Sequence, residues 1–338
     1  MKRLTVKRWL FTVGGMFILF IISIAVCVLI GPTHLDFREA LRPEVVRNPQ
    51  ASILFGIRLP RVLLAGLIGG ALAGAGVVFQ AILRNPLAEP YVLGISSGAA
   101  LGAAAGILTN VQYTIFGFST MTVFAFLGAL LTIFFVYGVA QSYGRIITHS
   151  LLLTGVIVNY VFAAVIMLIT SLVDFNKTRD ILFWLMGSLG KMQYRYSTIA
   201  SSFLYILVGA VVLMWYSREL NLLSLGEATA GQLGVNVERL KKIVFVATSL
   251  ITAGAVAQGG PIGFVGLIVP HAMRMLFGPD HRLLFPVAFL SGGIFLIVSD
   301  TVARVGVHGS EIPVGVITAL CGGPLFIVLL RRQIKKTG

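Results

Sequence analysis

The sequence contains very little charge for its length. Only 11% of its 338 residues are Asp, Glu, Lys or Arg, whereas 57% are hydrophobic, and the mean hydropathy is +0.95. Soluble globular domains average about 25% charged residues, so this chain has too few to cover the surface of a soluble protein of its size. The composition excludes that class and predicts a protein whose solvent is the lipid bilayer.

Cysteines are scarce, and the common cofactor motifs are missing. Cys27 and Cys321 are the only cysteines, and both lie within apolar stretches, so we expect inert buried thiols and no disulfide framework. The sequence contains no G-x-x-x-x-G-K-[ST] phosphate-binding loop, no H-E-x-x-H motif and no cysteine–histidine cluster with metal-ligand spacing. These absences argue against a membrane enzyme and predict no catalytic, metal or cofactor site in this chain.

What the sequence does contain is a series of long apolar stretches joined by short polar connections. A helix needs about 20 apolar residues to cross a bilayer. The first stretch is too long for a signal-peptide core and no A-x-A site follows it, so we expect it in the mature protein. The block 243–270 is too long for one crossing, and Gly259-Gly260-Pro261 breaks it. We predict an all-α polytopic membrane protein with a single transmembrane domain over 1–338 and ten spans, at 10–31, 62–83, 91–108, about 116–141, 150–173, 196–216, 243–258, 261–276, 283–299 and 312–330.

The basic residues set the expected orientation. Ten spans place both ends on one side, and the basic segments 2–8 and 331–336 put that side in the cytoplasm, because Lys and Arg are enriched in cytoplasmic loops. We expect the tails 1–9 and 331–338 there, with the spans in an inner or plasma membrane. The formal net charge of +14 is spread over short clusters between spans, so it does not indicate a nucleic-acid partner.

The expected exterior nevertheless holds many arginines, among them Arg38, Arg42, Arg47, Arg58 and Arg61. One interpretation is that long external loops follow the positive-inside rule only loosely. The other is that an acidic partner docks from outside. The charge pattern leaves both open.

A break inside the membrane is predicted at the NPLAEP segment, residues 85–90, because its two prolines end any helix that arrives there. Gly94, Gly98, Gly102 and Gly106 then line one face of the next helix and allow a neighbouring backbone to approach closely. Irregular backbone at membrane depth is tolerated only where protein buries it or where it lines a water-filled path. The break therefore indicates a translocation route, and transport is the first functional hypothesis.

Ten spans also divide into five plus five, an odd number per half, which gives the two halves opposite orientations. Broken, glycine-rich pairs near Asn85 and Pro261 fit such an inverted repeat, although the halves share little visible sequence identity. The glycines of the second span, Gly66, Gly70 and Gly74, predict close helix packing.

Two connections between spans are expected to form short helices. Residues 176–190 contain FWLM at 183–186 among polar and charged residues, which predicts an external interfacial helix with Trp184 at headgroup depth. The longest cytoplasmic connection, 218–242, contains LGEATAGQLGV at 225–235. Glu227 suits the first turn of a helix and Gly234 its end, so we expect a short helix across the inner surface, with a solvated connector as the alternative.

The acidic residues give no sign of ion coupling. An ion-driven carrier places carboxylates well inside its spans, whereas Glu89, Asp300 and Glu311 all lie near the ends of expected spans. We therefore expect the energy for transport to come from another polypeptide. An ion-driven secondary transporter is the alternative of another class.

Several segments, in this order, resemble the FecCD-like permeases, which are membrane subunits of ABC importers for ferric siderophores, haem and cobalamin. The resemblance covers nearly the whole chain from about Gly56 onward. Its motifs are RLPR at 58–61, Gln80 followed by NPLAEP at 85–90, LGEATAGQLGV at 225–235, GFVGLIVPH at 263–271, DHR at 280–282 and EIPVG at 311–315.

The resemblance implies partners. A FecCD-like permease pairs with a second permease copy or a paralogue and binds two ATP-binding cassette subunits on its cytoplasmic face. Those subunits, and not this chain, would hold ATP and magnesium. An external substrate-binding protein would deliver the cargo, and the mechanism would be alternating access by rigid-body tilting of the helix bundles.

The resemblance also implies roles for individual residues. Arg58, Arg61 and Arg304 are expected to be external sockets for carboxylates of the binding protein, although Arg304 could instead pair with Asp300 four residues earlier. Asn85, Leu87 and Thr148 resemble a cytoplasmic gate. The helix that couples to the ATPase would present Leu225, Gly226, Glu227, Ala228, Gly231, Leu233 and Gly234.

The cargo is not identified by the motifs. GPIGF at 260–264 looks somewhat like the cobalamin branch. Ferric siderophore is favoured because it is the most populous class of the family, with cobalamin and haem as alternatives. A large chelate would suit a wide, weakly interacting pathway without buried ionisable groups.

Overall fold

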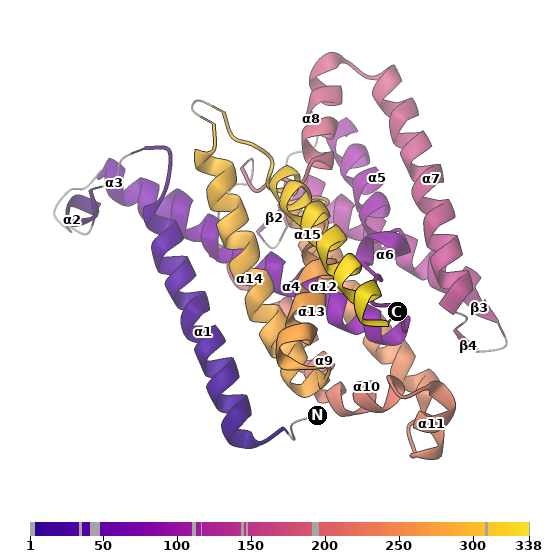
Figure 1. Ribbon diagram of the computed structural model, residues 1–338. Coiled ribbons are helices and arrows are strands. Elements are labelled where there is room, and N and C mark those ends of the chain that lie inside the picture. Colours follow the sequence, from indigo (N-terminus) through magenta and orange to yellow (C-terminus); the bar gives the residue numbers. More distant parts are fainter. Residues whose placement is uncertain are drawn as a thin grey trace.

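The structure is a computed structural model that describes residues 4–33, 36–40, 48–109, 113–115, 117–142, 145–146, 148–190, 196–307 and 310–337. Within these residues, ten helices correspond one to one with the ten expected spans (Figure 1). They are α1 (Val6–Leu29), α4 (Leu59–Ile82), α5 (Ile95–Leu108), α6 (Thr120–Ala140), α7 (Thr148–Leu172), α9 (Tyr196–Trp215), α12 (Val237–Gly259), α13 (Val265–Phe277), α14 (His281–Val305) and α15 (Val314–Thr337). Seven helices of the described chain are long and apolar enough to cross a membrane, and α5, α13 and α15 contribute shorter apolar segments. The prediction of an all-α polytopic membrane protein is confirmed.

The connections carry short helices and two small antiparallel hairpins. Helix α3 (Pro49–Ala51) continues through a π-helical turn, η1 (Ser52–Arg58), directly into α4. The hairpins pair β1 (Thr114–Ile115) with β2 (Phe118–Ser119), and β3 (Gln141–Ser142) with β4 (Arg145–Ile146). The other short helices are α2 (Phe37–Ala40), η2 (Pro90–Leu93), α8 (Phe175–Leu185), α10 (Ser217–Leu223) and α11 (Glu227–Gln232).

Helix α4 runs through the centre of the subunit and is buried along almost its whole length. Helices α14, α12, α13, α9 and α1 surround it. Its glycines make this possible, because a Cβ at Gly69 would overlap the carbonyl oxygen of Gly292 on α14, and a Cβ at Gly76 would overlap that of Gly266 on α13. The close packing predicted for the glycine-rich second span is therefore present.

The two ends of the bundle carry different connections. The N-terminal end of α1 lies at the same end as α10 and α11, and α2, α3 and α8 lie at the opposite end (Figure 1). Helix α8 confirms the expected short helix between the fifth and sixth spans, and Asp174 caps it by accepting a hydrogen bond from the Lys177 amide. Trp184, which the sequence placed at headgroup depth, is half-buried and packs against the apolar cores of the bundle.

Helix starts differ from the expected spans where backbone geometry or capping decides them. Helix α5 begins at Ile95 and not at 91, because η2 ends at Gly94 in a left-handed conformation. Helix α13 begins at Val265, because Gly260 and Phe264 both have a φ of +70°. The break predicted at Gly259-Gly260-Pro261 is confirmed. The five-plus-five inverted repeat stays a prediction.

Candidate functional site

Two helix breaks that are far apart in the sequence meet inside the bundle. The first separates α4 from α5, and the second separates α12 from α13. Glu89 belongs to the first break, and its Oε1 accepts a hydrogen bond of 2.8 Å from the amide of Phe264 in the second. Phe264 is the N-cap residue of α13. A carboxylate is favourable there, because it satisfies a free amide and lies at the positive end of the helix dipole.

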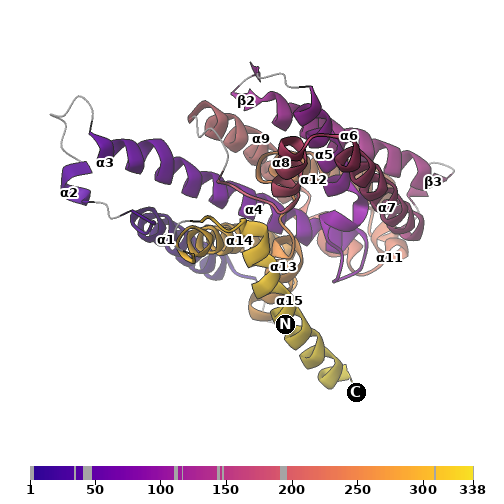
Figure 2. The same cartoon turned by 90° about the horizontal axis from the view of Figure 1, so that it is seen from above.

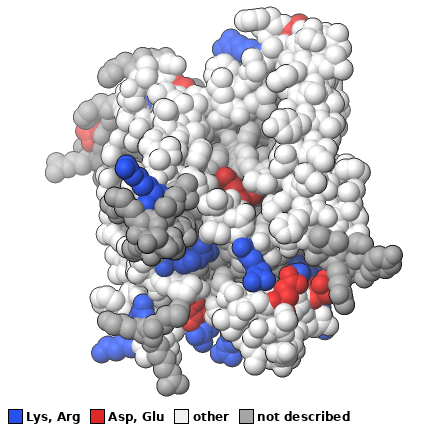
Figure 3. Space-filling view, turned by 45° about the vertical axis from the view of Figure 1, so that its right-hand side comes forward, with Lys and Arg blue, Asp and Glu red and all other residues white. Residues whose placement is uncertain are grey.

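This meeting point lies at the middle depth of the bundle. Gly266 faces Leu72 and Pro90 so closely that a Cβ on it would lie 3.0 Å from the Leu72 carbonyl oxygen and 3.2 Å from the Pro90 Cδ. Leu72 is near the middle of α4. Figure 3 shows an acidic side chain within a hollow at mid-height of the bundle.

The structure therefore corrects the expectation for Glu89, which lies at mid-depth and not at a span end, whereas Asp300 and Glu311 do lie near the ends of α14 and α15. It also corrects the expectation that ionisable groups are not buried, since Asp300 is fully buried. The NPLAEP segment turns back into the bundle after α4, so α5 starts at mid-depth and has only 14 residues. This geometry carries Glu89 inward. Broken helices that face each other at the bilayer midplane are the usual construction of transporter pathways.

Two of the three residues expected at the gate, Asn85 and Leu87, lie at this break, and in the described part of the chain the third, Thr148, is not joined to them. Asn85 Oδ1 accepts a hydrogen bond of 2.9 Å from the Leu87 amide, which closes a tight turn directly after α4. Leu87 is exposed. Thr148 begins α7, and within the described residues no hydrogen bond connects it to Asn85 or Leu87. Gln80, from the same motif, links α4 to α13 through a bond of 3.3 Å to the Leu267 carbonyl.

The segment 225–235 forms an exposed knob at the end of the molecule that carries the N-terminus (Figure 1). Helix α11 has six residues, and Gly226 and Gly234 flank it with φ angles of +123° and +87°. The side chain of Ala230 points inward and is buried. The outward face mixes apolar and polar side chains. Leu225 and Leu233 are 64% and 57% exposed, Thr229 and Gln232 are also exposed, and nothing lies within 4 Å of a Cβ placed on Gly231. The short helix predicted here is confirmed.

Two polar contacts anchor this knob to the membrane helices. Glu227 Oε1 lies 2.7 Å from Lys241 Nζ, and the Lys241 side chain is only 2% exposed on α12. Asn221 on α10 donates to Asp280 Oδ1 and accepts from the His281 amide, each at 2.8 Å. The knob is therefore tied directly to the start of α12, and the preceding helix α10 is tied to the start of α14. Neither Lys241 nor Asn221 was among the site residues predicted from the sequence. A lysine at the edge of an apolar span is the signal that could have indicated Lys241.

Asp280 is the central acceptor of the second anchor. It caps α14 by accepting from the Arg282 amide, and the Arg282 side chain donates to both of its oxygens. The bonds from Arg282, and then the bond from Asn221, lower the pKa of Asp280 to about 2 although burial opposes the shift. Asp280 is thus an anion at every physiological pH.

The arginines expected to be external sockets are instead buried, each no more than 4% exposed. Arg61 donates to Asp300 from Nε and Nη2 and to Glu311 Oε2 from Nη1, with distances of 2.9 to 3.1 Å. Arg304 Nε lies 3.2 Å from Asp300 Oδ2, which confirms the alternative pairing along one helix. Arg58 donates to the backbone carbonyls of Leu29 and Thr33.

These contacts correct the expectation of exposed sockets. For Arg61 and Arg304, the carboxylates expected on a partner are supplied by Asp300 and Glu311 of the same chain, and Arg58 uses backbone carbonyls instead. A fully buried Asp300 needs cationic partners, because an unpaired charge inside an apolar bundle is costly. Asp300 directly follows the apolar stretch 283–299, and an acid at that position was the sequence signal for this cluster.

Comparison with known proteins decides the family, because the model of the FecCD transport family matches residues 18–332. The chain belongs to the FecCD transport family. It is 45% identical over 290 residues, 84% of this chain and 75% of the relative, to the cobalamin import system permease protein BtuC of Halobacterium salinarum. It is 38% identical over 323 residues, 95% of each chain, to the hemin transport system permease protein HmuU of Yersinia pestis.

A solved structure agrees with these sequence relatives. The chain matches, with a TM-score of 0.81 and 34% identity, a protein described as an inward-facing metal-chelate type ABC transporter, over 95% of this chain and 98% of that one. FecCD membership makes this chain a membrane permease subunit of the ABC importer class, and its helices make it a multi-pass membrane protein.

Proposed function

We propose that this FecCD permease forms half of the translocation pathway of an ABC importer for a metal chelate, with ferric siderophore as the first candidate. The observation that carries the proposal is the contact between the two broken helix pairs at mid-depth through Glu89 and Phe264. Backbone breaks at this depth line a pathway in transporters. A helix bundle that only packs, and transports nothing, has no need of such breaks.

The proposed partners match the two ends of the molecule. Two ATPase subunits, which would hold ATP and magnesium, bind the exposed knob around α11. The end that carries α11 faces the cytoplasm together with both chain termini, and Lys and Arg gather over the lower half of the face in Figure 3, as the positive-inside rule expects. The substrate-binding protein docks at the opposite end. There Arg58, Arg61 and Arg304 hold the ends of α1, α4 and α14 in place and do not contact the partner directly.

A second permease copy completes the pathway. Helix α15 leans away from the rest of the subunit (Figure 2), and its Leu320 and Ile327 are each 67% exposed. Movement of the ATPases would reach α12 and α14 through the anchors of the knob, and α14 packs extensively along the central helix α4. Rigid-body tilting of these helices would then open the pathway alternately to each side.

Cobalamin is the second candidate cargo, because a relative that is 45% identical is a cobalamin import permease. The experiment that tests both is uptake into proteoliposomes that contain this permease with its ATPase and binding protein. We expect ATP-dependent accumulation of one chelate among radiolabelled ferric siderophore, cobalamin and haemin. Accumulation driven by an ion gradient without the ATPase would overturn the proposal in favour of a secondary transporter.

A further inference from the structure

The outer wall of the subunit contains an apolar groove that plays no part in the proposed pathway. It has a volume of about 520 Å³, within the range of small-molecule sites, and lies between α6, α9 and α12. Its lining is apolar except for Tyr137, Lys242 and Ser249. The rim of the groove carries exposed apolar side chains, those of Phe134, Val246 and Leu250. In a membrane protein such a surface meets acyl chains.

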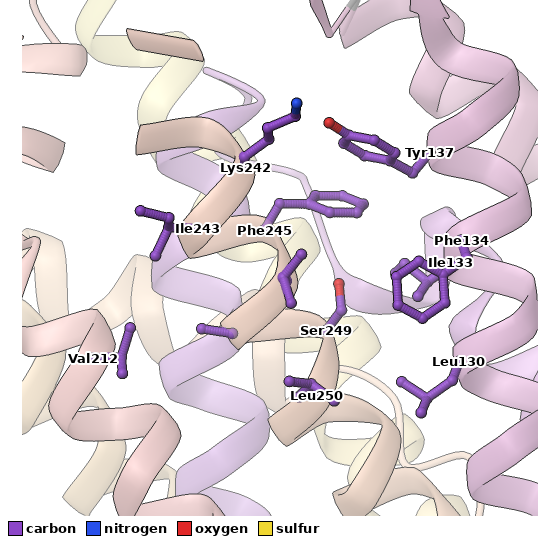
Figure 4. Close-up of a pocket in the computed structure, with 12 residues that line it drawn as sticks. Leu130, Ile133, Phe134, Tyr137, Val212, Lys242, Ile243, Phe245, Ser249 and Leu250 are labelled. Atoms are coloured by element: carbon purple, nitrogen blue, oxygen red, sulfur yellow. The ribbon is translucent and has the colours of Figure 1, made fainter. Parts of the chain in front are cut away.

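The polar groups lie at defined places in the groove. Figure 4 shows that the Lys242 ammonium and the Tyr137 hydroxyl point into the same end. Lys242 is near the start of α12, at the end of the molecule that carries α11. Ser249 is seven residues further along, about 10 Å deeper at 1.5 Å per residue.

These groups lack partners within the protein. Among the described residues, the buried hydroxyl oxygens of Tyr137 and Ser249 have no hydrogen-bond partner. Ser249 is only 2% exposed, so bulk water does not supply one. In the described part of the chain Lys242 makes no ion pair, and Glu227 pairs with the neighbouring Lys241. Buried polar groups are normally satisfied, so an external ligand is expected.

We propose that the groove binds one anionic glycerophospholipid of the leaflet next to α11. Its phosphate lies between Lys242 and Tyr137, which both offer donors, its ester groups lie at the depth of Ser249, and an acyl chain fills the apolar groove. Basic pockets between membrane helices bind anionic headgroups in this way. The charge of Lys242 favours an anionic headgroup over a zwitterionic one.

The test is native mass spectrometry of the full-length chain in detergent, titrated with palmitoyl-oleoyl phosphatidylglycerol. We expect one lipid per subunit, and about fivefold weaker binding by Lys242→Gln, the effect of one basic residue near an anionic headgroup. Leu250→Trp, which fills the groove from the lipid side, should also lose the lipid. Arg239→Gln and Leu131→Trp are the controls, since Arg239 is exposed outside the groove and Leu131 is an exposed residue of α6 that does not line it.

Equal binding by wild type, Lys242→Gln and Leu250→Trp would overturn the site. Equal loss in Leu131→Trp would do the same, because it would show a general effect of tryptophan on the annular surface. Phosphatidylethanolamine and diacylglycerol with the same chains complete the series. Binding of either as tight as that of phosphatidylglycerol would overturn the headgroup assignment, and a change of oligomeric state with no change in bound lipid would show that another protein surface covers the groove.

Discussion

At the scale of single residues, the subunit contains several charges that are buried because specific partners receive them. Lys241, Asp300 and Arg61 are each almost fully buried, and each has an oppositely charged partner at 3.2 Å or less. Removing one member of such a pair leaves an uncompensated charge, which costs more than the pair contributes. The effects of substitutions at these residues should therefore depend on whether charge or only hydrogen bonding is lost.

Glu89 provides the first prediction. Glu89→Ala removes the acceptor of the Phe264 amide and should destabilise the folded subunit by about 1–2 kcal/mol, as loss of a helix cap does. Glu89→Gln keeps a side-chain carbonyl at nearly the same position and should cost less. Thermal unfolding in detergent measures both. An Ala variant as stable as wild type would show that the two breaks do not depend on this contact.

Asp280 provides a prediction about pH. Its folded-state pKa of about 2 lies below the ordinary value of about 3.9, so the carboxylate stabilises the fold at neutral pH. This contribution is complete above the unfolded-state pKa and is lost as the pH falls toward the folded-state pKa. Asp280→Asn keeps the cap and removes the charge, so it should lower the melting temperature at pH 7, and the gap to wild type should narrow between pH 5 and pH 3. A difference in melting temperature that stays constant with pH would mean that the charge of Asp280 does not stabilise the contact between α10 and α14.

At the scale of elements, the glycine face of α5 packs extensively against α6 of the same subunit. A Cβ on Gly98 would overlap Thr132 Oγ1 and lie 2.7 Å from the Gly128 carbonyl oxygen. The spacing of the glycines predicted a close neighbour. It could not say which helix that neighbour is.

Gly98→Leu should therefore destabilise the isolated subunit, by about 1–3 kcal/mol or more, because overpacking forces α5 and α6 apart. Gly138→Leu is the matched control, since it lies on α6 with nothing within 4 Å of its Cβ. Both variants are compared by yield of monodisperse protein and by thermal unfolding. Equal behaviour of the two would show that α5 and α6 do not pack as described.

At the scale of the whole molecule, an exposed knob is connected through α12 and α14 to the buried core. The Glu227–Lys241 contact makes Glu227 a poor site for testing ATPase binding, because its loss would disturb the fold. Gly231 is better, because its Cβ direction is open. The knob can then be blocked without changing the bundle.

Gly231→Trp should leave folding and membrane insertion intact and abolish stimulation of the ATPase by the loaded binding protein. Gly56→Trp, also at an open position but on η1 at the far end, should leave complex formation with the ATPase unchanged. Copurification of the ATPase and its hydrolysis rate check both. Normal stimulation of the ATPase in the Gly231 variant would show that residues 225–235 are only a connector between α10 and α12.

Local sequence was sufficient for the ten apolar helices and for the two breaks between them. Apolar length set the spans, prolines and glycines set the breaks at 85–90 and 259–261, and the LGEATAGQLGV segment predicted a short helix, because each of these depends on residues close together in the chain. The family motifs added the class of protein, which the comparisons confirm.

Tertiary structure alone decided which charges meet and at what depth. Glu89 and Phe264 are 175 residues apart, and Arg61 and Glu311 are 250 apart. Hydropathy placed Glu89 at a span end, because it assumes that the chain crosses the membrane as straight helices. A segment that turns back brings a carboxylate to mid-depth, and the packing of α4 against α14 gives Arg61 its acids within the subunit. Such pairings arise from the packing of distant segments, and no local pattern contains them.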